Sequence, residues 1–155
     1  MTISENVAAV LDHVITAENK SGHKTTVIGV TKYVDADKAR ELVEAGITHI
    51  AENRTELFLD KQEKLSDLPI TWHLIGTLQR RKVKDVINHV DYFHALDSIK
   101  LAYEIDKRAD HVIKCFLQVN VSGETSKHGF SPDELADVLP EISNLSKVKI
   151  VGLMT

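Results

Sequence analysis

Short apolar segments alternate with amphipathic segments along the chain, and this alternation restricts the possible folds more than any other feature. The apolar segments are rich in β-branched residues and predict six strands, at residues 26–32, 47–51, 70–75 and 92–96, within 111–121, and at 148–154. Apolar residues at helical spacing predict helices over residues 3–21, 35–45, 55–65, 79–88 and 98–109, and a last helix after residue 131. A β-then-α unit repeated roughly every 20 to 25 residues is typical of an α/β fold with a parallel sheet.

Capping residues support two of the predicted helices. Asp35 is placed to cap the helix after the first strand, and Gly46 is placed to end it. Ser131 is placed to cap the last helix, with Pro132 at the first helical position and Glu134 completing a capping box. Local sequence therefore predicts both ends of one helix and the start of the other.

Two architectures accommodate six such units, and the periodicity alone does not choose between them. A doubly wound open sheet would be complete at 155 residues, whereas an eight-stranded β/α barrel usually needs about 200 to 250 residues or more. No strand is followed by a G-x-G-x-x-G or G-x-x-x-x-G-K-[ST] pattern. That observation disfavours the dinucleotide-binding and P-loop versions of the open sheet.

The first predicted strand, TVIGVTK at residues 26–32, ends in an amine. A lysine that simply marks a strand end is the more common situation, by roughly two to one. A lysine whose amine is kept neutral by burial can instead act as a nucleophile. Lys32 is therefore a candidate site residue that needs support from its surroundings.

Every predicted strand is followed by polar or small residues, at the edge of a parallel sheet where α/β proteins build their sites. Helix capping explains some of these residues as well as a functional role does. Asn53 lies deeper in a charged turn, where capping is a weaker explanation. After Lys32, the strand-following residues are Glu52-Asn53-Arg54, Gly76-Thr77, Asp97-Ser98, Asn120 with Ser122, and Thr155.

The composition is that of an ordinary globular domain and argues against several classes of protein. A net charge of -4 and an isoelectric point of about 6.0 give no general attraction to nucleic acid or to anionic membranes. One cysteine, Cys115, excludes an internal disulfide framework, and no apolar run approaches the length of a membrane span. The N-terminus MTISENVAAV lacks the features of a secretion signal, so we expect a cytoplasmic protein.

Six short segments carry a resemblance to a known family. In chain order they are VTKYV, IAENR, WHLIGTLQRRK, HALDS, VNVSGETSKHGF and VGLMT, and HLIG-x-LQ together with N-V-S-x-E-x-S-K-x-G is the specific combination. With this order and spacing, residues 26–155 resemble the pyridoxal phosphate homeostasis proteins, relatives of the alanine racemase N-terminal barrel. The resemblance implies a TIM-like (β/α)8 barrel, here cut short after about six β/α units.

The resemblance also implies a cofactor, pyridoxal 5′-phosphate (PLP), and the residues that hold it. The family lysine at the end of the first strand carries PLP as a Schiff base, and Lys32 occupies this position. Asn53 falls on the family position that contacts the cofactor ring. His73 and Met154 fall on strand ends close to the cofactor.

Length is the largest departure from the family pattern. Members continue for two more β/α units, which supply a serine-rich turn, an arginine facing the pyridine nitrogen and a glycine-rich turn for the phosphate. We therefore expect residues 1–155 to form a single PLP-binding barrel domain that is incomplete at its C-terminus. Smaller departures are Arg81, where a small polar residue is usual, and Ala95-Leu96, where Ser-Val is common.

The function implied by the resemblance is intracellular PLP homeostasis rather than turnover of amino acids. The implied partners are PLP and PLP-dependent apoenzymes, and the full-length protein is expected to be a monomer. The alternative is a PLP-dependent amino-acid racemase, which needs proton donors on both faces of its substrate, commonly a lysine and a tyrosine. Tyr33 follows Lys32, but adjacent strand residues point to opposite sides, and Tyr92 and Tyr103 lie at no strand end.

Other features are explained better by structure than by binding. Arg80-Arg81-Lys82-Lys84 is expected to be a solvated helix face rather than a nucleic-acid site, because the net charge is negative and no aromatic residues accompany it. His111 and Cys115 have helical spacing but lie in a predicted strand, which argues against a metal site. Cys115, Trp72 and Phe116 are expected to be packing residues.

Overall fold

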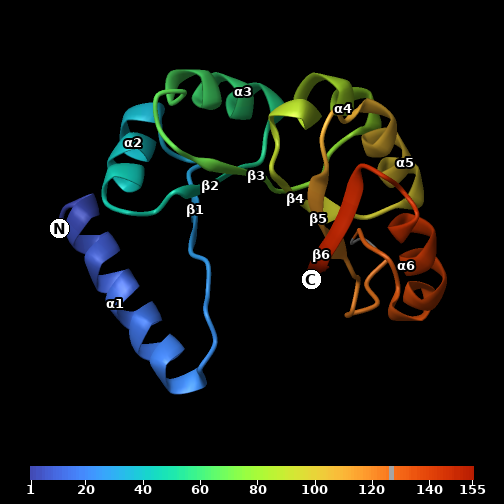
Figure 1. The fold of residues 1–155 in the computed structure, drawn as a ribbon, viewed down its shortest axis with the longest axis horizontal. Coiled ribbons are helices and arrows are strands. Elements are labelled where there is room, and N and C mark those ends of the chain that lie inside the picture. The colour runs from blue at the N-terminus through green and yellow to red at the C-terminus, as the bar shows by residue number, and fades with distance from the viewer. Residues whose placement is uncertain (126–127) are drawn as a thin grey trace.

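The computed structural model describes residues 1–125 and 128–155, and in this part of the chain six strands form one sheet (Figure 1). The order of the strands across the sheet is their order in the chain, and every neighbouring pair is parallel. The strands are β1 (Ile28–Val30), β2 (His49–Glu52), β3 (Thr71–Leu74), β4 (Tyr92–Leu96), β5 (Ile113–Gln118) and β6 (Val148–Met154).

The sequential strand order decides between the two architectures that the periodicity left open. A doubly wound sheet reverses its strand order at a switch point, and no reversal occurs between β1 and β6. Each strand instead lies beside the one before it, as in a β/α barrel. β1 and β6 are the two edges of the described sheet, so the six units form an open arc of barrel.

The helices that connect the strands lie on one side of the sheet. Figure 1 shows α2 to α6 following one another around the outside of the strands, while α1 extends away to one side. Gly22, in the left-handed region at φ 75°, ends α1. The helices are α1 (Ile3–Ser21), α2 (Ala36–Glu44), α3 (Thr55–Lys64), α4 (Arg80–Val86), α5 (Ile99–Arg108) and α6 (Leu135–Ser143), with 3-10 turns at Ile87–His89 and Pro132–Glu134.

The main core lies between the sheet and these helices. Alternate strand residues point toward the helices, and the buried Trp72 of β3 meets Phe58 of α3 edge to face, with ring centroids 5.4 Å apart. Gly29 lies where β1 meets α2, because a Cβ there would stand 2.5 Å from a methyl carbon of Leu42. Fully burying a side chain such as Phe58 contributes about 1.5–3 kcal/mol, so this layer is the main source of stability.

The opposite face of the sheet lines the inside of the arc and is more polar. Here Phe116 of β5 lies beside His94 of β4, with ring centroids 4.5 Å apart. The predicted packing role is confirmed for Trp72 and Cys115, which are buried in the core. Phe116 packs on the inner face, among aromatic and imidazole rings rather than against a helix.

The first strand and the start of the last helix differ from the prediction, whereas the predicted strands at residues 92–96 and 148–154 are confirmed. The first strand is shorter than predicted, because the chain turns after Thr31 and so releases Lys32 from the sheet. The predicted cap by Ser131 is wrong, since its side chain makes no capping hydrogen bond. A 3-10 turn starts the last helix instead, with the Glu134 N–H donating to the Ser131 carbonyl at 3.1 Å.

Candidate functional site

The carboxyl ends of all six strands lie at one edge of the sheet, because the strands are parallel. We call this edge the mouth of the barrel and define it by the residues that follow the strands. They include Lys32, Asn53, Asp97, Asn120 and Thr155. Residues that are far apart in the sequence are thus brought to the same edge.

Lys32 lies two residues beyond β1 and is half-buried. The ladder continues past the strand, since the Thr31 N–H donates to the Ala51 carbonyl at 3.1 Å. The chain then turns, and the Val34 N–H donates to the Thr31 carbonyl at 3.2 Å. In the described part of the chain the Lys32 amine has neither a hydrogen bond nor an ion pair, and its Nζ lies 5.1 Å from the centroid of the Tyr33 ring. This amine is therefore available to a ligand.

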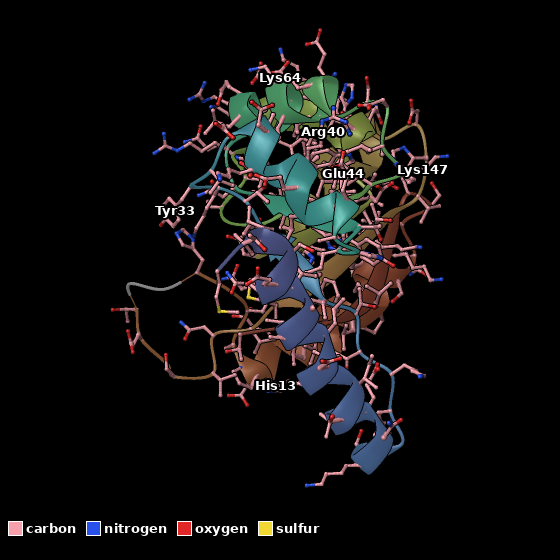
Figure 2. All side chains as sticks on the ribbon, turned by 90° about the vertical axis from the view of Figure 1, so that its left-hand side faces the viewer. His13, Tyr33, Arg40, Glu44, Lys64 and Lys147 are labelled. Atoms are coloured by element: carbon pink, nitrogen blue, oxygen red, sulfur yellow. The ribbon has the colours of Figure 1, made fainter. Side chains whose placement is uncertain are left out.

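Tyr33 does not point away from Lys32, and the prediction that it does is wrong. That prediction assumed that both residues belong to a strand, whereas they lie in the turn after β1. The Tyr33 side chain is 90% exposed and projects from the surface (Figure 2). The two side chains therefore share one side of the turn.

Asn53 follows β2 directly and is half-buried. Val30 pairs with Ala51, so Lys32 and Asn53, each two residues further on, occupy matching positions at the mouth. Asn53 also lines a hollow of about 430 Å³ together with Arg54, Thr55, Glu56, Thr77, Leu78, Gln79, Arg81 and Lys82. Of the four predicted site residues, Lys32 and Asn53 are the pair that the sheet register brings together.

His73 lies within β3 as the third of its four residues, and it is only 2% exposed. It pairs with Ala51, so its side chain lies one layer below Asn53 rather than at the mouth. Its ring is the middle member of a histidine chain, formed by His49, His73 and His94 on three neighbouring strands. The Nδ1 of His49 lies 2.9 Å from the Nε2 of His73, and the Nδ1 of His73 lies 2.8 Å from the Nε2 of His94.

Burial favours the uncharged form of two members of the histidine chain, His73 and His94. Burial, and then the neighbouring rings of His94 and His49, lower the pKa of His73 to about 3. Burial also lowers the pKa of His94. Each N···N contact needs one proton, which neutral imidazoles supply. The His73 ring stacks on Tyr92, with centroids 4.6 Å apart and an angle of 9° between the planes, so the layer below the mouth presents a flat pair of rings.

Met154 is the last residue of β6, as predicted, and it is half-buried. Its carbonyl accepts a hydrogen bond from the Val119 N–H at 2.9 Å. β6 and β1 are opposite edges of the described sheet, so Met154 and Lys32 approach the mouth from different ends of the arc.

Asp97 lies just before α5 but does not cap it. Ser98 fulfils this role, because its hydroxyl accepts the Leu101 N–H at 3.1 Å. Burial raises the pKa of the Asp97 carboxyl, and His128, whose Nδ1 lies 3.5 Å away, partly offsets this effect. Asp97 is thus a further titratable group at the mouth.

A buried ion pair behind the mouth was not anticipated. The Lys61 amine of α3 donates to the Glu52 carboxylate at 2.8 Å, and the Thr31 hydroxyl donates to the same carboxylate oxygen at 2.5 Å. The Lys61 and Glu52 side chains are 8% and 0% exposed. One signal could have found Glu52: it shares strand parity with the apolar Ile50, so it points toward the helices and needs a buried cation there.

Sequence and structure comparisons place the chain in a family. The alanine racemase N-terminal domain family matches residues 6–155. The pyridoxal phosphate homeostasis protein of Aquifex aeolicus is 36% identical over 161 residues, covering 100% of this chain and 71% of that protein. The chain belongs to the pyridoxal phosphate homeostasis protein family. Another member, from Pseudomonas aeruginosa, is 33% identical and is matched over 99% of this chain and 69% of its own length.

Solved structures confirm the barrel fold of this family member. PipY of Synechococcus elongatus with PLP bound matches with a TM-score of 0.82 at 35% identity, covering 99% of this chain and 69% of that one. An alanine racemase from Clostridium difficile matches with a TM-score of 0.72 at 16% identity, over 96% of this chain and 39% of that one. The racemase shares the fold alone.

Residues 1–125 and 128–155 lack two further features, a membrane-spanning helix and a metal-binding cluster. None of the helices there combines the length and the apolar character that crossing a membrane requires. The same residues contain no group of three or more His, Cys, Asp or Glu side chains arranged to hold a metal ion. The histidine chain is joined by hydrogen bonds between its rings instead.

Proposed function

We propose that this protein binds PLP at the mouth of the barrel, that Lys32 holds the cofactor as a Schiff base, and that the protein serves intracellular PLP homeostasis. The observation that carries the proposal is the Lys32 amine, half-buried at the exit of β1 with no hydrogen bond or ion pair among the described residues. Membership of the family supports the cellular role, and the PLP-bound structure of PipY supports the cofactor.

The neighbouring residues fit an aromatic aldehyde. Asn53 offers an amide at the matching position of the next strand, and the uncharged His73 ring, stacked on Tyr92, offers a flat layer beneath. Met154 adds an apolar side chain at the far end of the arc. When bound, PLP supplies an aldehyde carbon that a neutral lysine amine can attack. Barrels usually hold phosphate after the seventh and eighth strands, so the described residues are proposed to supply the amine and the ring contacts.

Lys61 is the other lysine close to this turn, and its contacts exclude it as the reacting amine. Its three N–H groups donate to the carbonyls of Thr31 and Val34 and to the Glu52 carboxylate, at 2.7, 2.8 and 2.8 Å. An ammonium that makes three such bonds has no lone pair to offer. Lys32 is therefore the better nucleophile.

An absorption titration tests the proposal. Wild-type protein titrated with PLP is expected to develop a band at about 420 nm, the region typical of a lysine Schiff base. Lys32→Ala is expected to abolish this band, whereas Lys24→Ala, at an exposed position before β1, is expected to keep it. An equal band in the Lys32→Ala protein would contradict the assignment of Lys32.

An amino-acid racemase is the second candidate, and the Tyr33 ring beside Lys32 is the observation that favours it. Racemisation needs an acid on the substrate face opposite the lysine, whereas Tyr33 lies on the same side of the turn and is open to water. Exchange of the Cα hydrogen of L-alanine in D₂O with PLP present would reveal this activity. Exchange that is lost in Tyr33→Phe would support the racemase, and no exchange would leave PLP binding as the function.

A further inference from the structure

We propose that Lys61, held by Glu52, is a positioning residue that fixes the turn on which Lys32 is presented. The proposal deepens the proposed function and rests on Lys32 as the PLP-binding amine. It assigns to α3, through a residue that lies behind the mouth, control over the geometry of that amine.

The contacts of the Lys61 amine bracket Lys32 in the chain. Its Nζ donates to the carbonyl of Thr31, the residue just before Lys32, at 2.7 Å. It also donates to the carbonyl of Val34, two residues after Lys32, at 2.8 Å. One side chain from a helix thus holds both sides of a four-residue turn. The backbone itself also closes the turn, through a longer hydrogen bond from the Val34 N–H to the Thr31 carbonyl at 3.2 Å.

Glu52 orients this amine. The Glu52 Oε2 accepts from the Lys61 Nζ at 2.8 Å and from the Thr31 hydroxyl at 2.5 Å. The carboxylate is fully buried and is the last residue of β2, the strand that pairs with β1. Its position relative to the turn is therefore set by the sheet, and the hydrogen bonds transmit that position to Thr31 and Lys61.

The energetic cost of burying the Lys61–Glu52 pair indicates that the pair does more than stabilise the fold. Burying two charges costs several kcal/mol per ion, and apolar residues of similar size often stabilise a fold as well or better. Glu52 is also incompletely satisfied, because its Oε1 is buried without a hydrogen-bond partner in the described part of the chain. Holding two carbonyls that flank a reactive lysine accounts for a buried ammonium, which a methionine could not replace.

The test is a double substitution that removes the Lys61–Glu52 pair, which we call the clamp, without leaving an unpaired charge in the core. Glu52→Gln with Lys61→Met leaves no unpaired buried ion, and Asp60→Asn with Lys64→Met removes an exposed ion pair of 3.0 Å from the same helix as a matched control. PLP is added over a range of concentrations, the Schiff base is fixed with borohydride, and the label on each lysine is mapped by mass spectrometry.

In the clamp variant the PLP concentration for half-maximal label on Lys32 is expected to rise about tenfold or more, because misplacing a reacting group is costly even when its chemistry is intact. Hydrogen exchange of the amides of residues 32–34 is expected to accelerate in the same variant. The control is expected to match the wild type in both measurements. A folded clamp variant that labels Lys32 at wild-type concentrations would overturn the proposal.

Two further outcomes keep the test decisive. If the clamp variant does not fold, limited acetylation of the wild-type protein replaces it as the test. A clamped Lys61 is expected to be acetylated far more slowly than Lys32. Equal acetylation rates of the two lysines would refute the clamp. If the wild type captures no PLP on Lys32, the proposed function fails. Acceleration of hydrogen exchange at residues 32–34 in the variant then supports the clamp, and unchanged exchange refutes it.

Discussion

Replacing His73 with phenylalanine is expected to make the stability of this protein less sensitive to acid. Phenylalanine keeps a flat ring against Tyr92, whose ring stacks on His73 at 4.6 Å, but removes the group that resists protonation in the folded state. The groups that face His73 are His49, His94 and Tyr92, so the substitution isolates the centre of the histidine chain.

The sign and size follow from the two pKa values of His73. Its pKa is about 3 in the folded protein and 6.5 for the ordinary group. As the pH falls below 6.5 the unfolded state takes up the proton first, so stability is lost progressively until the pH passes the folded value. Between pH 7 and pH 5 the loss from this one residue is about 2 kcal/mol, and its limit at low pH is about 5 kcal/mol.

Urea unfolding at pH 7, 6 and 5 measures this effect. The free energy of unfolding of the wild type is expected to fall more steeply than that of His73→Phe, by about 2 kcal/mol over the range. His13→Gln, on the exposed surface of α1 (Figure 2), is the control for removing an imidazole outside the chain of three. Equal slopes for wild type and His73→Phe would refute the conclusion that His73 is held neutral by burial.

Three other substitutions or treatments test separate parts of the structure. Lys61→Met alone leaves the buried Glu52 carboxylate without its cation and is expected to lower the free energy of unfolding in urea by about 3–5 kcal/mol. A loss no larger than that of the double variant with Glu52→Gln would contradict a buried ion pair. Gly76→Ala is expected to cost about 1–2 kcal/mol, because Gly76 has φ 79° while its new Cβ would meet Asn53 at an ordinary 3.5 Å; an unchanged melting temperature would argue against this backbone conformation. Burial raises the pKa of the Cys115 thiol to about 12, so a thiol reagent at pH 8 is expected to label Cys115 only on unfolding, and rapid labelling of the native protein would show that Cys115 is accessible.

Local sequence predicted much of the fold because each strand and helix has its own apolar period. β4 and β6 have the bounds that the apolar runs predicted, and Asp35 caps α2 by accepting the Lys38 N–H at 2.9 Å. The order of the strands could not be read from periodicity, because strand pairing depends on contacts between distant segments. The short β1 was missed for the same reason, since Lys61, 30 residues after Thr31, helps to turn the chain there.

The candidate site was only partly predictable. Lys32 was identified because a lysine directly after a buried strand is conspicuous in a sequence. The histidine chain was not, because His49, His73 and His94 are widely separated and become neighbours only through the register of β2, β3 and β4. Because of that register, His73 lies in the layer beneath the mouth and not at the predicted strand end.

The most direct test of this account is to treat the protein with PLP, reduce it with borohydride and locate the modified peptide by mass spectrometry. The account predicts that the reduced cofactor is found on Lys32, in the turn between β1 and α2. Modification of other lysines in preference to Lys32, or no modification of Lys32 under conditions in which the protein is folded, would contradict it.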